Sequence, residues 1–77
     1  MNTKEKLLRI LIELNPDIDY ESETALVDDG LFDSLEVMTI VTDIDDYFHI
    51  DIDPDEVIAE NFNSVENIMS LIKKYTE

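Results

Sequence analysis

The sequence of 77 residues has no cysteine, no tryptophan, one glycine and two prolines. The absence of cysteine excludes disulfides, thiolate metal sites and a cysteine nucleophile. Basic residues are also scarce, because five Lys and Arg stand against 20 Asp and Glu and leave a formal net charge of −15. Binding to DNA or RNA needs a basic patch that neutralises phosphates, so this composition excludes nucleic acid and disfavours an anionic membrane surface.

The few basic residues lie only at the two ends of the chain. All five fall within the first nine or the last five residues, so residues 10–72 contain 18 Asp and Glu and no Lys or Arg. A partner that recognises the middle of the chain by charge should therefore be basic.

No long hydrophobic run is present. The N-terminal apolar segment is interrupted by Arg9 and Glu13 and has no small-residue cleavage site, so we expect neither a signal peptide nor a transmembrane helix, and a cytoplasmic protein. The length predicts one domain, residues 1–77, that buries only roughly 60 to 65% of its unfolded surface. The 44% apolar content is enough for such a core.

Apolar residues recur at three- and four-residue steps, which predicts an all-α protein. We expect a small four-helix bundle with helices at about 4–14, 34–48, 54–60 and 64–75, of which the third is short. The second helix has one apolar face that should point to the core: Val37, Ile40, Val41, Ile44 and Phe48. Thr3 is the expected N-cap of the first helix, and Asp33 with Glu36 forms a capping-box-like start for the second.

Two stretches between the helices need their own interpretation. Residues 16–33 form a long acidic loop, which we expect to be ordered by Leu26 and Leu31. Residues 50–53 alternate apolar and acidic side chains like a strand, but no second alternating run exists to pair with them.

The many acids suggest calcium, yet no loop fits. Stretches that start at Asp17 and Asp51 both lack the glycine at the sixth position and the glutamate at the twelfth that an EF-hand needs. We expect no specific metal site, and either weak divalent binding or a diffuse counterion effect. The adjacent pairs Asp28–Asp29 and Asp45–Asp46 are expected to be solvated, because such pairs arise by composition alone.

A hydrolase would need Ser34 as nucleophile and His49, the only histidine, as base. On one helix these residues lie 15 positions apart, roughly 22 Å at about 1.5 Å per residue, so they cannot meet. His49 is then an ordinary helix-end residue or a pH-sensitive partner contact. Nothing else in the chain offers catalytic groups, and we expect no enzyme.

Ser34 stands in the run Gly30-Leu31-Phe32-Asp33-Ser34-Leu35, which precedes the second helix and Ile50-Asp51-Ile52. This pattern, over essentially the whole chain, closely resembles the acyl carrier protein family. The resemblance implies that 4′-phosphopantetheine from coenzyme A is esterified to Ser34 and that its thiol holds an acyl or aminoacyl thioester. On local grounds alone Ser34 could equally be a mere helix cap. A phosphodiester is tolerated at a helix N-terminus, where free N–H groups and the helix dipole favour negative charge.

The resemblance also assigns neighbouring residues. It implies that Asp33 and Leu35 help the cofactor site and that a partner surface follows along the second helix: Glu36, Met38, Thr39, Thr42, Asp45 and Asp46. For Leu35 and Met38, plain core packing remains the alternative. The implied partners of this monomeric carrier are a phosphopantetheinyl transferase, a loading ligase and downstream acyltransferases with basic docking surfaces.

Two departures concern the type of carrier. Leu31-Phe32 stands where fatty-acid carriers usually have a small residue before Asp, and Thr39 where they usually have glutamate. The pattern is closer to free-standing carriers of D-alanyl, nonribosomal peptide or specialised acyl pathways. The alternative from another class is an acidic helical module that binds a basic protein surface without a prosthetic group.

Overall fold

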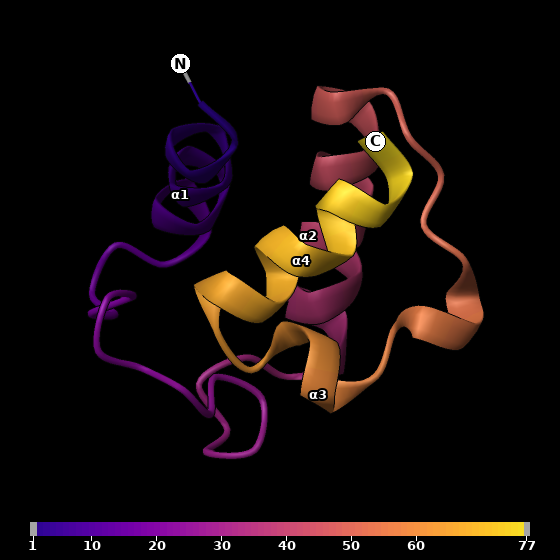
Figure 1. Cartoon of the computed structure of the whole chain (residues 1–77). Coiled ribbons are helices and arrows are strands. Elements are labelled where there is room, and N and C mark those ends of the chain that lie inside the picture. The colour runs from indigo at the N-terminus through magenta and orange to yellow at the C-terminus, as the bar shows by residue number, and fades with distance from the viewer. Residues whose placement is uncertain (1, 77) are drawn as a thin grey trace.

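The computed structural model describes residues 2–76 and is helical (Figure 1). The elements in chain order are α1 (Thr3–Leu14), α2 (Ser34–Phe48), the 3₁₀ turn η1 (Pro54–Glu56), α3 (Ala59–Phe62) and α4 (Val65–Thr76). No strand occurs in residues 2–76, so the all-α prediction is confirmed and residues 50–53 are not a strand. Within the same range no helix is long and apolar enough to cross a membrane.

The predicted bounds of α1, α2 and α4 are correct to within one residue, but one cap is different. Asn2, not Thr3, caps α1, because its side chain accepts a hydrogen bond from the Glu5 N–H at 2.8 Å. Asp33 caps α2 in a full capping box with Glu36, as expected. The α2 residues predicted for the core are buried or, at Phe48, half-buried.

The prediction of one short helix over residues 54–60 is wrong. The Pro54 start signal produces only the turn η1, and the α-helical turn α3 begins at Ala59. Between them Ile58 is extended, with φ −123° and ψ 156°. Val57 ends η1 with φ −83° and ψ 72°, so the chain leaves the helical region before α3 begins.

The predicted anchors of the long loop, Leu26 and Leu31, both pack in or against the core, but two further anchors were missed. Leu26 is fully buried, but Leu31 is only half-buried, and the other anchors are Tyr20 and Phe32 at 6% and 1% exposure. The Tyr20 and Phe32 rings stack at a centroid distance of 6.2 Å. These aromatic contacts hold the loop against the core and set the position from which α2 begins.

Candidate functional site

The turn before α2 determines where Ser34 is presented. Gly30 has a positive φ of 77°, which glycine adopts without strain, and its N–H donates to the Val27 carbonyl at 3.0 Å. The chain then comes back to the core, where Phe32 is buried and its N–H donates to the Leu26 carbonyl. Because Phe32 points inward and Asp33 caps the helix, Ser34 is exposed as the first residue of α2.

The polar groups at the start of α2 leave room for an anion. The Asp33 carboxylate accepts from the Glu36 N–H at 2.8 Å, and Glu36 accepts in return from the Asp33 N–H at 3.3 Å. In the described chain, neither the Ser34 hydroxyl nor the N–H groups of Ser34 and Leu35 have a hydrogen-bond partner. A phosphate ester on the hydroxyl would meet these free N–H groups and the positive end of a 15-residue helix.

Apolar side chains surround the serine on the surface. Leu35 is 78% exposed, Met38 53% and Ile58 49%. The alternative that Leu35 and Met38 are core residues is therefore wrong. A hollow of about 250 Å³ opens beside the serine, and its lining is apolar apart from Ser34 itself: Val27, Ser34, Val37, Met38, Val57, Ile58 and Ala59.

The other predicted partner residues do not all gather around Ser34. Thr39 and Thr42 are exposed, and their hydroxyls donate to carbonyls one turn earlier in α2, each at 3.0 Å. The Asp45 carboxylate accepts from the Ile52 N–H at 3.0 Å, so it has a structural contact. Asp46 is exposed near the other end of α2 and lines a separate hollow between α1 and α2.

Five residues that line the hollow were not predicted as site residues: Val27, Val37, Val57, Ile58 and Ala59. Ile58 and Ala59 form part of the hollow beside Ser34, but the misplaced short helix hid their role. No local signal marks them, because four consecutive β-branched residues, 39–42, lie inside α2 without breaking it.

His49 takes no part in this site. It ends α2 in the left-handed conformation, with φ 56°, at the opposite end of the helix from Ser34. The structure thus agrees with an ordinary helix-end residue, and a serine–histidine pair within one molecule is excluded.

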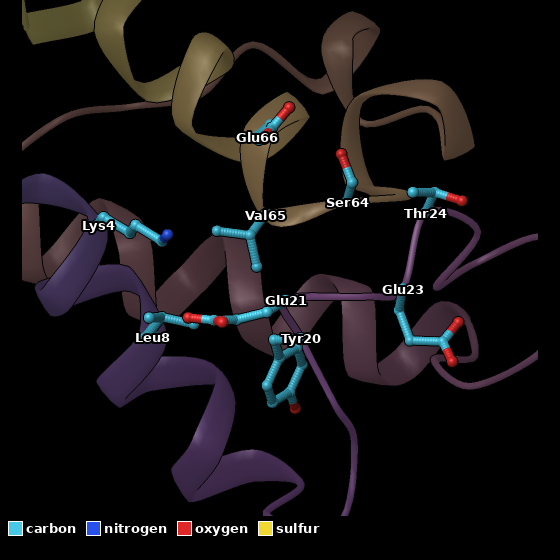
Figure 2. A pocket seen from close by; sticks show the side chains of 9 residues that line it. All are labelled: Lys4, Leu8, Tyr20, Glu21, Glu23, Thr24, Ser64, Val65 and Glu66. Atoms are coloured by element: carbon cyan, nitrogen blue, oxygen red, sulfur yellow. The ribbon is translucent and has the colours of Figure 1, made fainter.

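A second hollow, of about 240 Å³, lies between α1, the long loop and the start of α4 (Figure 2). Three carboxylates line it, from Glu21, Glu23 and Glu66, together with the Lys4 amine. Figure 2 shows the Glu23 and Glu66 carboxylates well apart, with that of Glu21 extended towards Leu8. Within residues 2–76 no three His, Asp or Glu side chains converge as metal ligands. We assign no ligand to this hollow.

Comparisons with known proteins connect the Ser34 site to a family. The family model described as "Phosphopantetheine attachment site" matches residues 5–72. The acyl carrier protein of Buchnera aphidicola subsp. Baizongia pistaciae (strain Bp) is 33% identical over 76 residues, which cover 96% of this chain and 95% of that relative. No solved structure matches significantly. The chain therefore belongs to the acyl carrier protein family of non-catalytic carriers, whose prosthetic group is covalently attached 4′-phosphopantetheine.

Proposed function

We propose that the protein carries 4′-phosphopantetheine on Ser34 and shuttles an acyl or aminoacyl thioester between biosynthetic enzymes. The observation that carries this proposal is the exposed Ser34 hydroxyl at the first residue of α2, inside Asp33-Ser34-Leu35. The prosthetic group supplies the thiol that holds the cargo, and the chain supplies its attachment point and its docking surface.

The residues around Ser34 fit such a group. The free N–H groups of Ser34 and Leu35 can donate to phosphate oxygens, and the helix dipole favours their negative charge by about 0.3 to 1 kcal/mol. Asp33 uses one carboxylate oxygen as the helix cap, and its second oxygen has no partner in the described residues. That second oxygen is free to face the magnesium ion of the transferase.

The surface next to Ser34 supports docking by basic enzymes. Leu35 and Met38 offer exposed apolar area, while Glu36, Asp45 and Asp46 add negative charge along α2, next to the polar Thr39 and Thr42. Enzymes that load and unload the carrier would then place Arg or Lys around a small apolar notch. Electrostatic steering of this kind raises association rates and lets weak complexes exchange quickly.

We also propose a specialised cargo rather than a housekeeping fatty-acid role, from Leu31-Phe32 and Thr39. The structure gives Phe32 a further reason to be large, because its ring is buried and stacks on Tyr20. Part of this departure therefore belongs to loop packing. Thr39 is the stronger support for a changed partner surface, since it is exposed where fatty-acid carriers usually have a carboxylate.

Intact mass spectrometry tests the proposal. The purified apo protein is incubated with coenzyme A, magnesium and a broad-specificity phosphopantetheinyl transferase. We expect the mass of one phosphopantetheinyl group to be added to the wild type and none to Ser34→Ala. No gain on the wild type would favour the acidic interaction module, and a gain that persists in Ser34→Ala would place the group elsewhere.

A further inference from the structure

The connection between α2 and α3 is long and has little regular structure. It leaves the C-terminal end of α2, runs along the outside of the molecule and reaches α3 near the Ser34 end (Figure 1). Its only regular element is the turn η1. The last residues of this connection, Val57 and Ile58, form one wall of the hollow beside Ser34 together with Ala59. The position of that wall therefore depends on what anchors the connection.

The first part of the connection is held by the buried Ile52, whose N–H donates to Asp45, and the rest by contacts with the last turns of α4. We name these contacts the α4 clamp: Asp53, Glu56, Lys74 and Tyr75. The Tyr75 hydroxyl donates to Glu56 Oε2 at 2.6 Å and accepts from the Asp53 N–H at 2.9 Å. Lys74 Nζ lies 3.2 Å from Glu56 Oε1, the one ion pair found in residues 2–76.

Within the α4 clamp the tyrosine is the stronger contact. The Lys74 side chain is 62% exposed, and exposed ion pairs contribute little to stability. The hydrogen bond from Tyr75, followed by that from Lys74, lowers the pKa of Glu56. The same bond to Glu56 is the main cause that raises the pKa of Tyr75. Both directions agree with a carboxylate that accepts from a neutral phenol.

Glu56 connects the α4 clamp to the wall of the hollow. Its side chain is held by α4, while its backbone carbonyl accepts from the Ile58 N–H at 3.0 Å and from Asn61 Nδ2 at 2.8 Å. A shift of Glu56 must therefore move Ile58, whose side chain is 49% exposed beside Met38.

We propose that Tyr75 and Glu56 are positioning residues for the surface beside Ser34, because their contact fixes the wall that a docking enzyme meets. This inference rests on the proposed function, since it assumes that enzymes dock at Ser34. Tyr75 itself touches neither the serine nor the hollow. It acts through Glu56 and Ile58.

The test compares Tyr75→Phe, which removes only the hydroxyl, with two controls. Tyr47→Phe removes a hydroxyl that has no hydrogen-bond partner in the described residues and lies far along α2 from Ser34. Asn2→Ala removes the N-cap of α1 and lowers stability by about 1 kcal/mol without touching the connection. Amide hydrogen exchange and transferase kinetics are measured on each apo protein.

For Tyr75→Phe we expect exchange at Asp53, Val57 and Ile58 to be about tenfold faster, with exchange in α1 unchanged. The KM of the transferase for the carrier should rise about threefold at an unchanged kcat, and neither control should show this. Glu56→Ala should match Tyr75→Phe in KM and in exchange at Val57 and Ile58, and for these the double variant should go no further than either, because both changes remove the Tyr75–Glu56 hydrogen bond.

Three results would overturn the proposal. Faster exchange at Asp53 alone would mean that the α4 clamp does not hold the wall. If Tyr75→Phe has the same KM as Tyr47→Phe, the transferase does not respond to the α4 clamp. If Asn2→Ala raises the KM as much as Tyr75→Phe does, the effect comes from lost stability alone. If the transferase does not modify the wild type, both the proposed function and this inference fail. If it modifies the wild type and the KM for Tyr75→Phe equals the wild-type KM, only this inference fails.

Discussion

Among the side chains near Ser34, Met38 is the one whose substitution tests the docking surface most directly. Its side chain is 53% exposed on α2, four residues after the serine and beside the apolar hollow. A carboxylate at this position should leave the fold intact but oppose an apolar, basic-rimmed partner surface. We expect Met38→Glu to lower kcat/KM for modification by the transferase about tenfold, with a melting temperature close to that of the wild type.

The matched control for this variant is Ile12→Glu. Ile12 is 48% exposed on α1 and lies outside the hollow. Its replacement by glutamate therefore adds the same charge at a similarly exposed apolar position. Equal loading rates for the two variants would remove Met38 from the docking surface.

Tyr20 ties the long loop to α1 through its hydroxyl. The oxygen lies 2.8 Å from the Leu11 carbonyl oxygen and 2.6 Å from that of Asn15, and these two acceptors share its single hydrogen. Tyr20→Phe should therefore lower the free energy of unfolding by about 1 to 2 kcal/mol in urea titrations near pH 7. A loss below about 0.3 kcal/mol would contradict this role.

The raised pKa of Tyr20 predicts a loss of stability at alkaline pH. Burial, followed by the negative charge of Glu36, raises the pKa of Tyr20 from 10.0 to about 12. The folded state thus favours the neutral phenol: its contribution is complete below pH 10 and is lost as the pH rises through about 12. The stability difference between the wild type and Tyr20→Phe should therefore disappear across this window. A constant difference would show that the hydroxyl titrates normally.

At the scale of the elements, the sequence predicted best the helix whose start and core-facing side are both marked by local residues. The α2 helix has a capping box and a regular apolar face, so its bounds and core side could be predicted. The short helix could not, because Pro54 starts a turn with the same signal that starts a helix. The segment contacts α4 through hydrogen bonds of Asp53 and Glu56 with Tyr75, which join residues 22 and 19 positions apart, so no local signal shows where the turn ends and α3 begins.

The site was predictable to a similar degree. Ser34, Asp33 and Leu35 were assigned from the resemblance of the whole chain to a family, since local grounds alone left Ser34 equally a helix cap. Residues brought from elsewhere, such as Ile58, were not assigned, since their place depends on long-range contacts. The loop shows the same limit, because its polar anchor Asn63 lies 36 and 35 residues beyond the two loop amides that it binds.

Asn63 fastens the loop before α2 to the start of α4. Its Oδ1 accepts from the N–H groups of Val27 and Asp28, each at 3.0 Å, and its Nδ2 donates to the Asp28 carboxylate at 3.0 Å. We expect Asn63→Ala to lower stability by about 1 to 3 kcal/mol and to speed amide exchange at Val27 and Asp28.

Two further variants separate this role from general destabilisation. Asn63→Asp keeps the acceptor but loses the donor and faces Asp28 with a like charge, so its loss should diminish when salt is added. Asn67→Ala removes a single hydrogen bond, which the Asn67 side chain on α4 donates to the Glu60 carbonyl in α3. If Asn67→Ala speeds exchange at Val27 as much as Asn63→Ala does, the anchoring role of Asn63 is wrong.

For the whole molecule, the uneven charge connects docking with stability. Residues 10–72 hold 18 acids and no Lys or Arg, and the described chain has principal extents of only 29 × 28 × 18 Å. One ion pair, Lys74–Glu56, offsets this repulsion within residues 2–76. The surface that would attract basic enzymes therefore also destabilises the fold.

Screening should relieve this repulsion. Raising the ionic strength from about 10 mM to about 150 mM shortens the Debye length from about 30 Å to about 8 Å, from the size of the molecule to well below it. We expect the melting temperature to rise by roughly 5 °C, since about 1 kcal/mol shifts it by about 4 to 8 °C in a domain of this size.

Millimolar magnesium should also raise the melting temperature. A second titration at constant ionic strength separates the two causes, because a diffuse atmosphere predicts no added gain from magnesium, whereas carboxylates that bind divalent cations predict a further increase. A melting temperature that does not respond to salt would mean that self-repulsion is not what limits the stability of this carrier.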